Sequence, residues 1–353
     1  MEFGFSEDQL LFQKSFRDFL EGECAPDRIR ALWQSETGRS PGLWKGLAEL
    51  GVTGLLVPEA HEGLGLTEID SVLLMEEVGR AGLAEPLVST AAVAVPMLVE
   101  LAVADLCDAW LKRVAVGEAV IAVGHPLSPF VSDAHVANLL LLESGGEVHA
   151  VGRDAVQIEA QPTNDPARRI ARVQWTPSPE TRVAQGDRAT ALLDAALDRG
   201  ALACAAQALG VAEKLIDLAV DYARQREQFG VPIGSFQAVK HMLADCKVKL
   251  EYARPVVHRA AHSVARGSRG RGLHVSMAKL AATEAASFAA RVSLQVHGAI
   301  GYTWEQDVHI WMRRAWSLGM AWGRGAFHRA RVADAILAAD APVGPGRTFP
   351  GGE

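Results

Sequence analysis

The sequence predicts a mainly α-helical protein with a small β domain in its middle. Apolar residues recur at helical spacing in the first third of the chain and again after Gln185. Between about Glu118 and Val183 this pattern gives way to short apolar runs with β-branched residues, which are typical of strands. No internal repeat is evident. The expected parts are 1–117, 118–187, 188–341 and a mobile Gly/Pro-rich tail at 342–353.

Length and composition are those of an ordinary globular protein. The 353 residues suffice for two or three domains, with 49% hydrophobic and 22% charged residues. The formal net charge is -7, so no overall positive field would attract nucleic acid or an anionic membrane. No apolar run is long enough to cross a bilayer, and the first residues lack the pattern of a secretion signal. We therefore expect a cytoplasmic protein without nucleic-acid partners or membrane insertion.

The cysteines argue against a metal site. They are far apart and lack the paired spacing of metal ligands, so we expect reduced, mostly buried thiols. The four cysteines are Cys24, Cys107, Cys204 and Cys246.

Helix-start signals mark the N-terminal part. Ser6, followed by acidic residues, is typical of an N-cap, and Ser40-Pro41 is typical of a second helix start. Helical patterns also cover Thr67–Arg80 and Leu98–Val116. The segment Leu55–Leu66 is apolar and then turn-rich, so we expect a buried connection there.

Strand-like runs follow, and helices return behind them. Gly145-Gly146 fits a hairpin turn, and the basic segment Gly267–Gly272 is expected to be an exposed connection. Strands are expected at 120–123, 136–142, 148–151 and 170–175, and long helices at 189–225, 275–296 and 315–338.

Two stretches in the C-terminal part contain residues that suit a nucleotide ligand. At 295–301 a helical run ends in a small-residue turn, with the amide of Gln295 about one helical turn before Gly298. At 226–237 an arginine, an aromatic ring and a second amide surround a helix break. Taken alone, the stretch at 295–301 also fits a simple helix C-cap, and the stretch at 226–237 also fits a solvated arginine beside a core phenylalanine.

Along the chain, 226–237 is the first stretch and 295–301 the second, about seventy residues later. In this order the two stretches together resemble the C-terminal domain of the flavin-dependent acyl-CoA dehydrogenases. The resemblance extends to Tyr222–Gln225 before the first stretch and to Asp307–Ala315 after the second. Helices, then strands, then helices match the family's order of α domain, β domain and four-helix-bundle α domain. The resemblance thus covers nearly the whole chain.

The resemblance implies an oxidoreductase that performs α,β-dehydrogenation of an acyl-CoA thioester. In the family a glutamate removes the α proton, and FAD takes the β hydrogen as hydride. One family position for this base lies about 27 residues after Gln295, where this chain has Trp322. An indole cannot accept the proton. The resemblance therefore gives this position no catalytic residue.

The alternative family position for the base falls on Gly200, and the nearest carboxylate is Asp198. A shift of two residues turns a side chain to a different face of a helix, so we expect Asp198 to be a solvated surface residue. The flavin-ring segment of the family, Thr-Glu-x-x-x-Gly-Ser-Asp, is replaced here by Gly124–Asp133, and its Trp-Ile-Thr strand has no counterpart. Asp198 remains the one candidate base.

What the chain keeps, by resemblance, is the part that contacts the adenosine and pyrophosphate of FAD bound by a neighbouring subunit. Ala299 stands where the family usually has a second glycine. The residues implied are Arg226, Phe229, Gln237, Gln295, Gly298 and Ala299.

The chain resembles the subunit without a base in the heterotetrameric actinobacterial acyl-CoA dehydrogenases of steroid side-chain degradation. We therefore expect a subunit that completes the FAD site of a homologous catalytic partner and has little or no activity alone. Two alternatives stay open. One is a self-sufficient homo-oligomeric dehydrogenase that uses Asp198 or an unassigned carboxylate. The other is a non-enzymatic scaffold whose FAD contacts are vestigial.

Overall fold

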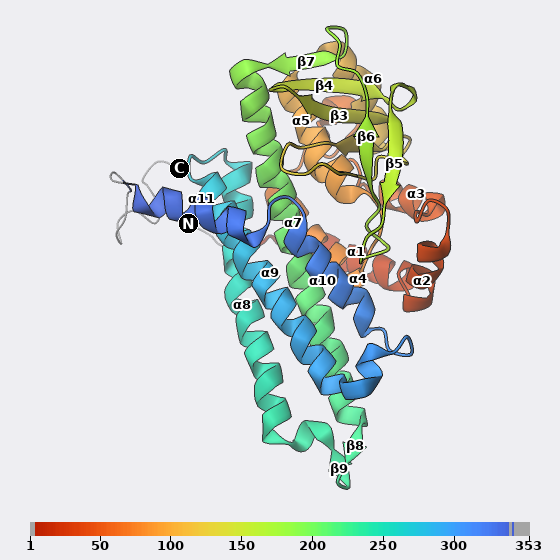
Figure 1. Ribbon diagram of the computed structural model, residues 1–353, viewed down its shortest axis with the longest axis vertical. Coiled ribbons are helices and arrows are strands. Elements are labelled where there is room, and N and C mark those ends of the chain that lie inside the picture. The colour runs from red at the N-terminus through yellow and green to blue at the C-terminus, as the bar shows by residue number, and fades with distance from the viewer. Residues whose placement is uncertain (1–3, 339–340, 342–353) are drawn as a thin grey trace. The chain divides into compact units, whose positions relative to one another are not determined.

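The computed structural model describes residues 4–338 and 341, and confirms a mainly α-helical fold with a small β domain (Figure 1). The chain forms two compact units, Met1–Leu74 with Leu83–Ala203 and Met75–Gly82 with Cys204–Glu353. Helices α4 (Glu68–Ala81) and α7 (Gly186–Gln225) contribute residues to both units. The division into three domains stays a prediction, and the predicted tail at 342–353 lies outside the described residues.

The first helices of the first unit begin where the capping signals predicted. The Ser6 hydroxyl accepts a hydrogen bond from the backbone N–H of Gln9 at 3.2 Å, which starts α1 (Glu7–Glu23). The Ser40 hydroxyl does the same at α3 (Pro41–Glu49). Helix α2 (Pro26–Gln34) was not predicted, although the proline in its first turn is typical of a helix start.

The helical pattern of Leu98–Val116 is two helices in the structure. After a π-helical turn at Val88–Ala94, α5 (Val95–Leu101) and α6 (Ala104–Ala115) are separated by Ala102, whose φ of 49° is left-handed. The connection predicted at 55–66 is buried only in its first half, because the side chains of its later leucines are more than a third exposed.

The β domain of the first unit consists of two sheets. The first has the order β1-β3-β4-β7 and the second the order β2-β6-β5, with β1 parallel to β3. The strands β3 and β4 form the predicted hairpin, with φ of 60° and 81° at Gly145 and Gly146. The strands are β1 (Ile121–Val123), β2 (Val131–Ser132), β3 (Leu139–Ser144), β4 (Glu147–Gly152), β5 (Gln157–Gln161), β6 (Ile170–Gln174) and β7 (Arg182–Gln185).

The second unit is helical. Figure 1 shows α8 (Gln237–Ala265) and α9 (Arg271–His297) side by side, with the short hairpin β8 (Glu227–Gln228) and β9 (Val231–Pro232) at the end where α8 begins. The single last helix predicted at 315–338 is wrong. The structure has α10 (Val308–Met320) and α11 (Gly325–Leu337) instead, separated by a break at residues 321–324.

Two glycines let helices approach closely within the second unit. A Cβ added to Gly210 of α7 would lie 1.8 Å from the carbonyl oxygen of Glu76 in α4. A Cβ on Gly79 would lie 2.0 Å from the carbonyl oxygen of Gln207. The two backbones are therefore in contact, and the buried Glu76 carboxylate beside them is held by Arg254 at 2.6 Å and His258 at 2.7 Å.

Several predicted absences concern the described part of the chain. None of the four cysteines forms a disulfide, and all but Cys24 are buried. Residues 4–338 and 341 contain no helix long and apolar enough to cross a membrane. The same residues contain no group of three or more His, Cys, Asp or Glu side chains that could hold a metal ion.

Candidate cofactor-binding site

The two stretches singled out in the sequence meet in the second unit. Tyr222, in the last turn of α7, stacks on His297, the last residue of α9, with ring centroids 4.4 Å apart and planes 23° apart. Arg226 follows the first of these helix ends and Gly298 follows the second. Residues about seventy positions apart in the sequence are therefore presented from two neighbouring helix ends.

The first stretch forms a tight hairpin. The backbone N–H of Ile233 donates to the carbonyl of Arg226 at 2.8 Å and closes its base. At the tip, Phe229 and Gly230 have φ of 55° and 77°, as a two-residue turn with a right-handed strand twist requires.

Phe229 is 92% exposed, and its ring is edge-on to that of Phe236 at 6.2 Å. The interpretation of Phe229 as a core residue is therefore wrong. A phenylalanine in the left-handed region and in water is unfavourable on both counts, which favours a binding role.

The second stretch ends α9 with an open glycine. Gly298 has φ of 65° and ψ of -142°, a conformation that favours glycine. A Cβ at this position would meet no atom within 4 Å, so one face of the turn is free for a ligand. Its N–H donates back to the carbonyls of Leu294 and Gln295. The glycine therefore offers close approach and not a free N–H group.

All six residues that the resemblance implied are exposed. Three of them have side chains that can donate hydrogen bonds: Arg226, Gln237 and Gln295. Within residues 4–338 and 341, these three side chains make no hydrogen bond or ion pair. The hairpin and the turn thus present a cation and two amides that have no partner of their own in this part of the chain, together with the exposed Phe229 ring.

The position predicted to lack a base lies in the break between α10 and α11. Trp322 and Gly323 both have positive φ, 52° and 93°. The buried Lys279 amine donates to the carbonyls of Leu318 and Ala321, the latter at 2.8 Å. His328 donates from Nε2 to the carbonyl of Trp322 at 2.9 Å. The break is therefore fixed by two buried side chains, and it presents no carboxylate at residue 322.

The protonation of His328 follows from these contacts. A carbonyl only accepts, so Nε2 carries the proton, and Nδ1 accepts from the Ser276 hydroxyl at 3.1 Å. Burial, with the nearby charges of Lys279 and Arg331, lowers the pKa of His328 to about 4. The ring is neutral at physiological pH.

Asp198 does not behave as expected. The prediction of a solvated surface residue is wrong, because Asp198 is only 2% exposed. The reason is that every residue of α7 from Ala195 to Ala212 except Arg199 is buried, so the face on which a residue stands does not decide its exposure there. Asp198 remains the candidate base of the self-sufficient alternative.

The segment in place of the family's flavin-ring motif has polar anchors that the sequence did not reveal. The His125 ring contacts the carbonyl of Leu193 in α7 at 3.2 Å and accepts from the N–H of Leu127. At the other end of the segment, Asp133 forms a buried ion pair with Arg39. Both anchors join residues far apart in sequence, so no local pattern could have signalled them.

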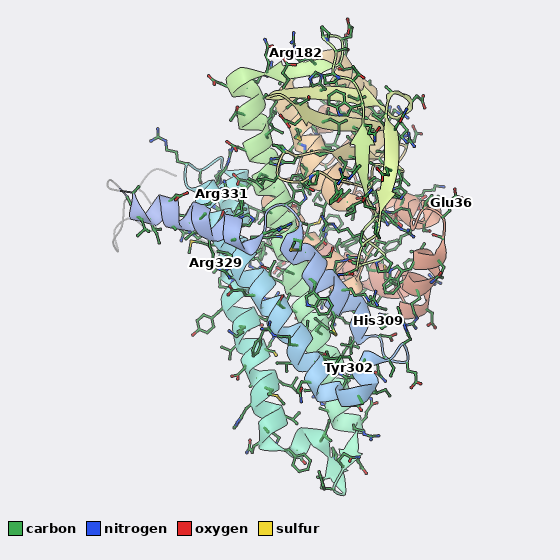
Figure 2. All side chains as sticks on the ribbon, in the orientation of Figure 1. Glu36, Arg182, Tyr302, His309, Arg329 and Arg331 are labelled. Carbon is green, nitrogen blue, oxygen red and sulfur yellow. The ribbon has the colours of Figure 1, made fainter. Side chains whose placement is uncertain are left out.

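Sequence reasoning also missed an exposed aromatic pair behind the glycine turn. Tyr302 is 80% and Trp304 63% exposed, and Figure 2 shows Tyr302 and His309 at this end of the helical unit. The Trp304 ring is edge-on to His309 at 4.6 Å, with the Arg313 guanidinium 5.1 Å from its centroid. Their exposure could have been predicted from the position of Tyr302 and Trp304 between two helices, because helical periodicity there gives no reason for burial.

Comparison with known proteins decides the family. Residues 6–118 match the N-terminal domain and residues 190–337 the C-terminal domain of acyl-CoA dehydrogenases. The chain belongs to the acyl-CoA dehydrogenase family. It is 34% identical over 311 residues to the acyl-CoA dehydrogenase IpdE2 of Mycobacterium tuberculosis, and this alignment covers 88% of this chain and 91% of that protein.

Solved structures of acyl-CoA dehydrogenases agree with the fold. The butyryl-CoA dehydrogenase of Megasphaera elsdenii has a TM-score of 0.85 at 22% identity and covers 96% of this chain and 100% of its own. The ChsE4–ChsE5 complex of M. tuberculosis has a TM-score of 0.84 at 24% identity, with 97% and 100% covered. A variant of the Tcur3481–Tcur3483 steroid ACAD has a TM-score of 0.85 at 26% identity, with 94% and 98% covered.

Members of this family are FAD-dependent flavoproteins that act on acyl-CoA. The exposed side chains fit the adenine dinucleotide part of FAD: a guanidinium suits a phosphate, amides suit ribose and phosphate oxygens, and the free Phe229 ring suits a flat heterocycle. The open face of Gly298 allows a bulky group to come close. No residue of this chain is assigned to the isoalloxazine ring.

Proposed function

We propose that this chain is a subunit of a heteromeric FAD-dependent acyl-CoA dehydrogenase. It completes the FAD site of a homologous catalytic subunit, which supplies the base for α,β-dehydrogenation. When bound, FAD supplies the acceptor for the hydride. This chain binds and orients the adenosine and pyrophosphate through Arg226, Phe229, Gln237, Gln295, Gly298 and Ala299, which we name the clamp.

One observation carries the proposal. The clamp faces outward with unpaired donors, while the base position holds Trp322 in a break fixed by buried side chains. A chain that bound FAD for its own use would need a carboxylate within reach of the substrate's α carbon. A chain that has the clamp but lacks the base is what we expect of a subunit that completes the FAD site of a catalytic partner.

The assembly and the substrate are proposed by analogy with the relatives. Similarity to the Tcur3481–Tcur3483 steroid ACAD and to the ChsE4–ChsE5 complex supports a heterotetramer that acts on a steroid-derived acyl-CoA. A role in steroid and lipid degradation in the cytoplasm is part of the same proposal.

The first experiment compares the chain purified alone with the chain co-expressed with a dehydrogenase encoded beside its gene. The flavin spectrum and the dehydrogenation of steroid side-chain acyl-CoA are measured in both samples. We expect flavin and turnover only in the complex. A flavin-loaded, active sample of the chain alone would favour the homo-oligomeric alternative, and Asp198→Asn is then the first variant to assay.

A matched pair of arginine variants separates the clamp from general surface charge. Arg226→Ala should strip flavin from the complex. Arg224→Ala removes an arginine two residues away that is 76% exposed and already lies 3.8 Å from Asp221, and this variant should retain flavin. Equal flavin content in both variants would support the scaffold alternative.

A further inference from the structure

The contact that joins the two halves of the clamp is an aromatic stack between two residues outside it. The His297 ring is buried and held in one orientation, because its Nδ1 donates to the carbonyl of Ser293 at 2.7 Å. Burial lowers the pKa of His297, so the ring is neutral at pH 7. A neutral, oriented imidazole presents a flat face for the Tyr222 ring.

Each ring of the stack is coupled to one clamp segment through the backbone. The carbonyl of Tyr222 accepts from the N–H of Arg226 at 2.8 Å, and His297 is bonded covalently to Gly298. The hairpin also packs against the same turn of α7, since a Cβ on Gly234 would lie 2.9 Å from the carbonyl oxygen of Ala223. A change in the stack is therefore transmitted to residues 226–237 on one side and 298–302 on the other.

We propose that Tyr222 and His297 are positioning residues, whose stack sets the spacing between the hairpin and the glycine turn for dinucleotide binding. The inference rests on the proposed function. A ligand held from two chain segments loses affinity when the segments move independently, because their fixed separation no longer offsets the entropy of ordering them. The rings thus act on FAD through their neighbours.

The test uses variants that keep or remove a ring. His297→Ala and Tyr222→Ala each remove the stack, whereas His297→Phe and Tyr222→Phe retain two rings, and the first of these removes only the bond to Ser293. The dissociation constant for FAD is measured on the deflavinated complex. We expect each alanine variant to bind FAD about tenfold more weakly, the phenylalanine variants to bind near the wild-type level, and the double alanine variant to be no weaker than either single one.

A second readout needs no partner. Hydrogen exchange of the full chain should rise in both 226–236 and 298–302 when either ring is removed, although each substitution adjoins only one of these segments. Tyr222→Leu keeps apolar volume without a ring and serves where Tyr222→Ala unfolds the chain. A rise confined to the segment next to the substitution would overturn the inference.

Comparison with Arg226→Ala distinguishes two kinds of failure. If Arg226→Ala loses FAD while the ring-removing variants keep it, the stack has no positioning role and the proposed function stands. If all of them keep FAD, the proposed function itself fails. Phenylalanine variants as weak as the alanine variants would likewise contradict the role of the stack.

Discussion

The sharpest stability prediction concerns two buried groups, Glu85 and His328, whose pKa values are shifted in opposite directions. Burial of the Glu85 carboxyl raises its pKa to about 7, against the hydrogen bond from the N–H of Ser40 and the charge of Arg39. Burial lowers the pKa of His328 to about 4. Each folded value differs by roughly two and a half units from the ordinary one, which corresponds to about 3 kcal/mol for each group.

The signs of the two contributions are opposite. For Glu85 the folded pKa lies above the unfolded one, so its contribution to stability is complete below pH 4.5 and is lost as the pH rises to about 7. For His328 the folded pKa lies below the unfolded one, so its contribution is complete above pH 6.5 and is lost as the pH falls to about 4. As the pH falls from about 7 to about 4, the stability gained through Glu85 and the stability lost through His328 offset each other in the wild-type protein.

The variants Glu85→Gln and His328→Gln uncover each effect in turn. Urea denaturation is measured at pH 7.5 and 4.5, on the transition of the unit that contains the substituted residue. Relative to wild type, Glu85→Gln should lose about 3 kcal/mol more on acidification, and His328→Gln should lose about 3 kcal/mol less. Comparing the same protein at two pH values removes the direct cost of each substitution. Wild-type pH dependence in His328→Gln would show that the imidazole titrates normally and would refute the lowered pKa that burial gives His328.

Further predictions test packing and ion pairing in the second unit. Gly210→Ala forces a Cβ against the carbonyl of Glu76 and should destabilise the protein by about 3 kcal/mol. Gly319→Ala, in the last turn of α10 where an added Cβ would meet no atom within 4 Å, should stabilise it by about 0.5 kcal/mol. Urea denaturation measures both changes. Arg254→Ala leaves the buried Glu76 carboxylate with His258 alone and should cost about 3 kcal/mol. Arg329→Ala, at a residue labelled in Figure 2, breaks an exposed ion pair with Glu284 and should cost about 0.5 kcal/mol or less in the same measurement.

Local chemistry explains which elements the sequence could predict. The caps at Ser6 and Ser40 and the Gly145-Gly146 turn depend on residues within three positions of one another, so their signals are complete in the sequence. The break at Ala102 was missed because a non-glycine residue adopts left-handed backbone there while apolar residues continue across it. At the second break Trp322 also adopts left-handed backbone, and the adjoining Gly323 was not taken as a helix end. In these two places tertiary contacts override the local preference.

The site shows the same division between local and distant information. The clamp residues could be proposed from the sequence because their motif spacing is preserved there, whereas the stack joins positions 222 and 297 and has no local signature. The burial of Asp198 contradicts the expected solvated surface residue, and the exposure of Phe229 contradicts the alternative interpretation of that residue as part of the core. Residue type suggested the opposite in each case, since phenylalanine is usually buried and aspartate usually exposed. Departures of this kind mark positions where binding or close helix packing decides the environment.

The energetics of Phe229 connect the isolated chain to the proposed complex. A non-glycine residue in the left-handed region costs about 1–3 kcal/mol, and the ring, 92% exposed, recovers none of this through burial in the chain alone. Complete burial of a phenylalanine contributes about 1.5–3 kcal/mol, which is enough to offset that strain once FAD and a partner subunit cover the ring. The same residue thus destabilises the free hairpin and stabilises the assembly. Trp322 differs, because its left-handed backbone is already compensated inside the chain by the buried Lys279 and His328. Strain left uncompensated at the clamp but balanced at the base position is what a subunit that completes a partner's site should display.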